Sequence, residues 1–137
     1  MKVSEIILHH SASHDGMATN WSQIRFYHTA LRGWKNVGYH YGIELVGQDY
    51  EVLLGRFENE DGAHCPGHNS KALGVCLVGN FEENYVPSEQ YQLALKLVRQ
   101  LMRNHNILLP NVYGHRELAD TLCPGKYFDL DAFRRDL

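Results

Sequence analysis

Two side chains that can bind metal stand in one short segment near the end of the chain, GHRELADTLCPGKYFD. His115 and Cys123 lie eight positions apart in it. A neutral imidazole and a thiolate are both good zinc ligands. The spacing does not match a closed structural zinc site built from C-x-x-C pairs. Taken alone, the segment is more simply explained as a polar loop with a buried cysteine, which is the usual state of that residue.

A second candidate is the pair His9-His10, which follows an apolar run near the N-terminus. Adjacent strand residues point to opposite sides, so only one of the two can face a given site. The chain holds nine histidines and three cysteines. Histidine is the commonest metal ligand and proton carrier, and an odd number of cysteines argues against a disulfide framework.

Short apolar and β-rich runs predict the strands that would position these side chains. Gly47-Gln48-Asp49 indicates a hairpin turn, and residues 56–71 lack a clear period and are expected to form a loop. The expected strands are Val3–Leu8, Tyr39–Val46, Tyr50–Leu54, Ala72–Val78 and Asn111–Tyr113.

Capping residues predict where helices begin. Thr19 or Asn20 can cap a helix over Trp21–Leu31 that ends near Gly33. Ser88 can cap the longest helix, which runs to about His105. Asp129 is expected to cap a last helix that continues through Arg135.

Strands that alternate with helices, together with one hairpin, indicate an α/β fold with a mixed central sheet flanked by helices. We expect one domain over residues 1–137. The strands Val3–Leu8 and Asn111–Tyr113 each end just before a histidine. Functional groups often gather at the carboxyl ends of strands, so His9 and His115 could meet.

The composition argues against several classes of protein. A chain of 137 residues with 44% hydrophobic and 21% charged residues fits a soluble globular domain. With a net charge of −3 and no basic stripe, neither nucleic acid nor an anionic membrane surface is an expected partner. The apolar run Ile6–Leu8 is too short for a signal peptide, and no run suits a membrane span. We therefore expect cytoplasmic synthesis and no membrane insertion.

Four segments taken together resemble the zinc-dependent N-acetylmuramoyl-L-alanine amidases of the phage-lysozyme and peptidoglycan-recognition-protein type. The segments are IILHHSAS, GWKNVGYHYGI, GAHCPGHNSKALGVCLVGNF and YGHRELADTLCPG. They occur in the family's order and at similar spacing, and they span nearly the whole chain. The resemblance implies a peptidoglycan-recognition-protein-like fold and one catalytic zinc ion.

The resemblance also implies the zinc ligands, which fall on His9, His115 and Cys123. His10 becomes the neighbour without a metal role. Two histidines and one cysteine leave a fourth position for water, as in catalytic zinc sites.

Two further positions match catalytic residues of the family. The catalytic tyrosine falls on Tyr39, and a second position, two residues before the cysteine ligand, is Thr121. Phage members carry lysine at that second position, whereas catalytic recognition proteins carry threonine. Lys126 lies beyond the cysteine and does not occupy it.

The substrate groove of the family is implied at a loop in the middle of the chain. His64 and Asn69 match positions that line the groove, and His68 is a further candidate contact. Arg56 and Glu58 fit either a substrate-binding role or a plain surface pair.

The activity implied by the resemblance is hydrolysis of the amide bond between N-acetylmuramic acid and L-alanine in peptidoglycan. We expect a monomeric phage or prophage endolysin that reaches the cell wall through a membrane lesion made by another protein. Two alternatives remain. A non-catalytic peptidoglycan-binding module would lack the cysteine ligand, and a cytoplasmic amidase that recycles muropeptides usually has aspartate there. The presence of Cys123 argues against both.

Overall fold

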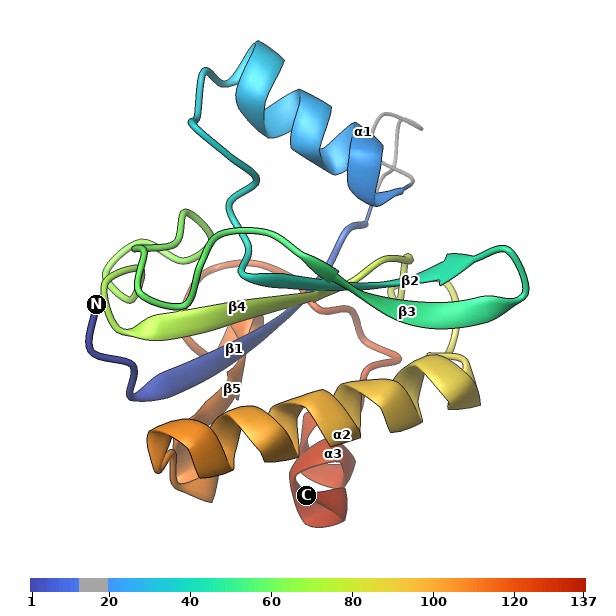
Figure 1. The fold of residues 1–137 in the computed structure, drawn as a ribbon. Helices are drawn as coiled ribbons and strands as arrows, with labels where there is room; N and C mark the ends of the chain where they lie inside the picture. Colours follow the sequence, from blue (N-terminus) through green and yellow to red (C-terminus); the bar gives the residue numbers. More distant parts are fainter. Residues whose placement is uncertain (13–19) are drawn as a thin grey trace.

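The computed structural model describes residues 1–12 and 20–137. Across these residues five strands form one sheet in the order β3-β2-β4-β1-β5 (Figure 1). Each strand lies within two residues of its predicted range. The strands are β1 (Glu5–His10), β2 (Tyr41–Val46), β3 (Asp49–Leu54), β4 (Ala72–Leu77) and β5 (Val112–Gly114).

The sheet is mixed, as the sequence predicts. β1 lies between β4 and β5 and is parallel to both, and β2 is parallel to β4. β2 and β3 form the antiparallel hairpin, whose turn contains Gly47 at a φ of +67°. The parallel register sets Leu8 opposite Gly114, so the carboxyl ends of β1 and β5 meet at one edge.

The prediction for β1 needs one correction. The strand continues to His10 instead of ending at Leu8, because His9 and His10 extend the ladder opposite Cys76 and Leu77 of β4. His9 is therefore part of the strand and does not follow it. Alternation along the strand sends the side chains of His9 and His10 to opposite faces of the sheet.

Helices cover both faces of the sheet (Figure 1). α2 (Ser88–His105) and α3 (Leu130–Asp136) lie on one face, and α1 (Trp21–Phe26) lies on the other. α1 continues into a π-helical turn, Tyr27–Leu31, so the two together fill the predicted helix. Short 3-10 turns flank β5 at Leu109–Asn111 and His115–Glu117.

The helix caps agree in part with the predictions. The Asn20 side chain accepts a hydrogen bond from the Gln23 N–H, whereas Thr19 lies outside the described residues. Asp129 caps α3, as expected. The N-cap of α2 is Pro87 in place of Ser88, and Ser88 is the first helical residue. No helix in the described part of the chain is long and apolar enough to cross a membrane.

The main core fills the space between the sheet and α2. Every residue of β1 and β4 is buried, as expected for central strands covered on both faces. Ile6 and Leu8 of β1 pack there with Leu95 and Val98 of α2. Ile7 points the other way and belongs to a separate small cluster. His9 follows the direction of Ile7, so it lies on the sheet face away from α2.

Candidate metal centre

The first predicted ligand, His9, lies on β1 at the carboxyl edge of the sheet. Its side chain is 1% exposed. Its Nδ1 lies 3.7 Å from the Cys123 Sγ, and its Nε2 lies 2.9 Å from the His64 Nδ1. Burial, followed by the neighbouring His64 and His115, lowers the pKa of His9 well below its ordinary value. A neutral imidazole is the form that binds a metal.

The second ligand, His115, follows β5 directly. Because β5 is parallel to β1, His115 emerges beside His9, and their ring centroids are 4.6 Å apart. Burial lowers the pKa of His115 as well. The carboxyl ends of two neighbouring strands thus bring together two histidines that are far apart in sequence.

The third ligand, Cys123, is brought back to this edge by a braced loop. Arg116 accounts for most of the bracing: its backbone N–H donates to the Cys123 carbonyl at 2.7 Å. Its guanidinium donates to the carbonyls of Gly125 and Phe128. The His10 N–H points at the Cys123 Sγ from 3.4 Å. Burial raises the pKa of the thiol to about 12, so a thiolate here needs a cation beside it.

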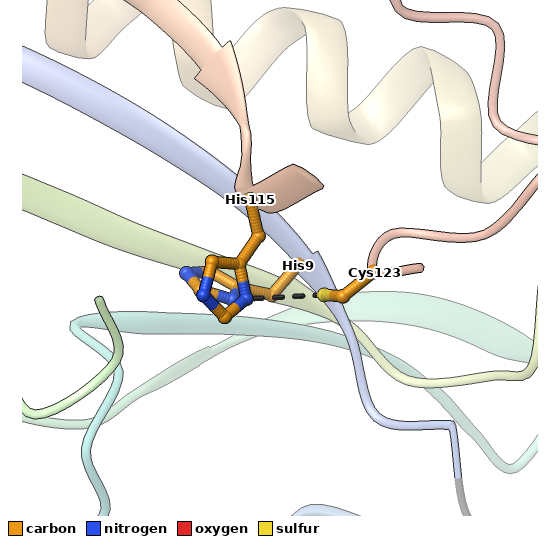
Figure 2. A group of neighbouring side chains, drawn as sticks. All are labelled: His9, His115 and Cys123. Atoms are coloured by element: carbon orange, nitrogen blue, oxygen red, sulfur yellow. Dashed lines mark hydrogen bonds between the residues drawn. The ribbon is translucent and has the colours of Figure 1, made fainter. Parts of the chain in front are cut away.

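These three side chains fit a zinc ion. Their ligand atoms all lie within 4.8 Å of one another (Figure 2). In a tetrahedral site with the usual Zn–N and Zn–S lengths, nitrogen and sulfur are about 3.6 Å apart. The 3.7 Å between His9 Nδ1 and Cys123 Sγ is close to that value. With two nitrogen donors and one sulfur donor, a zinc ion held here keeps a fourth position for water or substrate.

The ligand group lies in a cleft of about 760 Å³ on the α1 side of the sheet. Tyr39 and Thr121, the two predicted catalytic residues, border the same cleft. Residues after α1 also line the cleft, and Arg32 lies there over the rings of Tyr27 and Trp34. A volume of this size lies within the range of ligand-binding pockets.

The Tyr39 ring lies beside the ligand group, with its centroid 5.0 Å from that of His9. Burial and the neighbouring thiols of Cys76 and Cys123 raise its pKa well above the ordinary value. A hydrogen bond joins its side chain to that of Cys76. Tyr39 is therefore a protonated hydroxyl and can act as a hydrogen-bond donor at neutral pH.

Thr121 lies beside the third ligand. Its Oγ1 accepts a hydrogen bond from the Cys123 N–H at 3.2 Å. The hydroxyl proton remains available to a group in the cleft. Lys126 lies elsewhere: its Nζ is 5.2 Å from the Tyr127 ring, and it borders a different hollow beside Asp129.

His64 and Asn69, the predicted groove residues, both border the cleft. Both are also engaged within the protein. The His64 Nε2 lies 3.1 Å from the Ala72 carbonyl oxygen, and its Nδ1 contacts His9. The Asn69 Oδ1 accepts from the backbone N–H groups of His64 and Cys65. The structure thus adds to both residues an internal role that the sequence did not indicate.

The remaining sequence candidates lie away from the cleft. His68 is paired with Glu5 at 2.8 Å. Arg56 donates to the backbone carbonyls of Val37 and Asp61. Glu58 accepts from the Tyr41 hydroxyl and contacts His105. Of the two interpretations left open for Arg56 and Glu58, their contacts favour structural roles, though not as a pair with each other.

Sequence reasoning missed several residues that shape the site. Arg116 and Cys76 received no role, yet one braces the Cys123 loop and the other contacts the Tyr39 hydroxyl. The sequence placed Cys76 in an apolar predicted strand, but it did not indicate that this strand pairs with the one that carries His9. No pattern in the sequence pointed to Arg116, because its partners are backbone carbonyls.

Several known proteins resemble this chain in sequence and in fold. A family model described as N-acetylmuramoyl-L-alanine amidase matches residues 1–126. The endolysin of Escherichia phage T7 is 34% identical over 131 residues, which cover 91% of this chain and 81% of the endolysin. Peptidoglycan-recognition protein SC2 of Drosophila melanogaster is 33% identical over 129 residues, covering 90% of this chain and 68% of that protein.

A solved structure of similar fold is the N-acetylmuramoyl-L-alanine amidase LysC from Clostridium intestinale. It has a TM-score of 0.84 and 32% sequence identity, and the match covers 98% of this chain and 85% of that one.

Proposed function

The chain belongs to the N-acetylmuramoyl-L-alanine amidase family, and on that premise we propose that it hydrolyses the amide bond between N-acetylmuramic acid and L-alanine in peptidoglycan. The similarity to phage endolysins supports a role in cell-wall lysis. In that role the protein acts as a monomer on the wall after release through a membrane lesion.

One observation carries the proposal. The ligand atoms of His9, His115 and Cys123 lie within 4.8 Å of one another, and all three residues line one open cleft. These are donors that suit zinc, and we propose that they hold one zinc ion. Bound zinc supplies a Lewis acid for the scissile carbonyl and a water molecule that ionises near neutral pH.

We assign the stabilisation of the developing oxyanion to Tyr39. Its hydroxyl stays protonated and borders the cleft beside the ligands. A donor that is already placed where negative charge develops needs no reorganisation during the reaction. Thr121 supplies a second hydroxyl on the other side of Cys123, and both groups bind the substrate oxygen more tightly as its charge grows.

Proton transfer requires a different route from the one used by many hydrolases. Among the described residues that border the cleft, none is an aspartate or a glutamate. Tyr39 cannot accept a proton, since its hydroxyl is already protonated and its raised pKa opposes ionisation. We propose that water in the open cleft accepts the proton of the attacking water and returns one to the leaving amine.

The proposal is tested by digestion of purified sacculi, with mass spectrometry of the products. We expect new L-alanine N-termini and intact glycan strands. A zinc chelator and Cys123→Ala should each abolish release. Cys65→Ala is the matched control, because Cys65 is a buried cysteine outside the ligand group. Cleavage within the glycan, or full activity without zinc, would refute the proposal.

The same assay separates the two alternatives. A binding module would pull down sacculi without binding zinc or releasing peptide. A recycling amidase would cleave soluble anhydro-muropeptides but leave intact sacculi uncut. We expect cleavage of sacculi.

A further inference from the structure

We propose that His64 is a positioning residue that fixes the tautomer of His9, so that His9 presents its Nδ1 to the metal. This inference rests on the proposed metal site, but it concerns the protein's own hydrogen bonds. It gives His64 a role distinct from contact with substrate.

The donor and acceptor in both hydrogen bonds of the His64 ring follow from the Ala72 carbonyl oxygen, which can only accept. The Ala72 carbonyl oxygen lies 3.1 Å from the His64 Nε2, so that nitrogen must carry the hydrogen. A neutral imidazole has one N–H, and its other nitrogen is an acceptor. The His64 Nδ1 therefore accepts, and the group 2.9 Å away, the His9 Nε2, must donate to it.

The consequence appears on the other side of the His9 ring. When Nε2 carries the hydrogen, Nδ1 holds a free lone pair. This is the nitrogen that lies 3.7 Å from the Cys123 Sγ (Figure 2). The relay from Ala72 through His64 to His9 thus aims a lone pair at the point where the three ligands converge. Ligating histidines commonly donate their other N–H to a fixed acceptor, which sets the tautomer and orients the ring.

The neutral state of His64 is favoured by its surroundings. The side chain is 8% exposed. Its Nε2 faces a carbonyl oxygen and its Nδ1 faces the His9 Nε2, so one donor and one acceptor, as in a neutral imidazole, satisfy both contacts.

The His64 ring packs against two glycines that have no side chain to occupy its space. A Cβ added at Gly62 would lie 2.4 Å from the His64 Cδ2, and one at Gly74 would lie 2.7 Å from the same atom. The glycines leave a slot that the imidazole fills. Asn69 pins the backbone at the same point, since its Oδ1 accepts from the His64 N–H. The segment GAHCPGHN therefore builds a rigid support for His9.

The test measures zinc affinity and the tautomer of His9. In wild-type protein without metal, side-chain ¹H–¹⁵N NMR should show His9 protonated at Nε2. His64→Leu removes the acceptor, so we expect loss of that single tautomer and zinc binding weakened by about 10–100-fold in a chelator competition. His64→Asn offers an amide oxygen near the position of Nδ1 and should recover most of the affinity.

The matched control is His68→Gln, on the same loop but paired with Glu5 away from the cleft. It should leave zinc affinity and the His9 tautomer unchanged. Unaltered zinc affinity in His64→Leu, or a wild-type His9 protonated at Nδ1, would overturn the inference. If His64→Leu does not fold, the wild-type tautomer and His64→Asn still decide. Wild-type protein that has the expected tautomer but does not cleave sacculi would refute the proposed function alone.

Discussion

The two faces of the sheet are built in contrasting ways from the same strands. On the face covered by α2, Ile6 and Leu8 pack in a continuous apolar core with Leu95 and Val98. On the other face His9, His40 and His64 are buried, and their ring nitrogens form hydrogen bonds with neighbouring groups. Apolar packing tolerates partial relaxation, whereas a buried polar group that loses its partner costs its full desolvation. Because the cleft and the candidate ligands lie on the second face, the first should supply mainly stability and the second mainly chemistry.

The largest effect should come from the apolar face. Leu95 is 2% exposed within the main core. Leu95→Ala should lower the free energy of unfolding by about 2–5 kcal/mol while the folded fraction keeps its specific activity. Urea unfolding monitored by circular dichroism measures this. Leu108→Ala is the control: at 69% exposure it should change stability by less than about 0.5 kcal/mol. A large loss of specific activity in folded Leu95→Ala would remove the contrast between the faces.

Tyr39→Phe should show the opposite behaviour. Loss of the hydroxyl removes an oxyanion donor, so the rate on sacculi should fall by about 10²–10³-fold, with a small change in stability. Tyr41→Phe is matched to it, because the Tyr41 hydroxyl binds Glu58 away from the cleft. That variant should keep its activity. Near wild-type rates in Tyr39→Phe would mean that the hydroxyl does not contact the reacting carbonyl.

As the pH falls, His40 on the α1 side should lose its contribution to stability before Glu58 on the α2 side does. Burial lowers the pKa of His40 below its ordinary 6.5. Below pH 6.5 the unfolded chain therefore binds a proton at His40 more readily than the folded protein does. The contribution of neutral His40 to stability is fully present above pH 6.5 and is lost as the pH falls below that value. In metal-free protein His40→Asn should flatten this dependence by up to about 1 kcal/mol per pH unit.

Glu58, on the α2 side, should respond at lower pH. Burial raises its pKa, but hydrogen bonds from His105 and Tyr41 outweigh that effect and leave the pKa below 4.5. Its stabilising contribution is present above that ordinary value and is lost as the pH falls through the lowered one. Glu58→Gln should reduce the dependence below pH 4.5 and leave the loss that begins below pH 6.5 unchanged. A single acid transition, unaffected by either variant, would contradict this order.

Thr121→Val should have the smallest effect. It removes one hydroxyl that accepts from the Cys123 N–H. A single hydrogen bond of this kind contributes about 0.5–1.5 kcal/mol to stability, so we expect a loss of that size in the free energy of unfolding and a fall in rate smaller than that of Tyr39→Phe. Lys126→Ala, outside the cleft, serves as the comparison and should match wild type. A larger loss in Lys126→Ala than in Thr121→Val would reverse the assignment.

The sequence by itself determined the mixed α/β fold and the position of each strand to within two residues. Those features depend on local patterns: apolar runs, a glycine turn and helix caps. It also determined which residues could bind a metal, because imidazole and thiolate chemistry is a property of the residue. The family pattern then favoured His9 over His10 as the ligand, and strand alternation agrees with that choice.

Only the tertiary structure decided how those residues are held. The extension of β1 to His10 depends on pairing with β4, which local composition does not encode. Arg116 donates to the backbone carbonyls of Gly125 and Phe128. Because every residue has a backbone carbonyl, the sequence cannot indicate these partners. The placement of His64 against His9, across 55 positions of sequence, required the slot beside Gly62 and Gly74. The chemistry of a side chain follows from its residue type. Whether its nitrogen donates or accepts a hydrogen bond depends on the partner that folding places beside it.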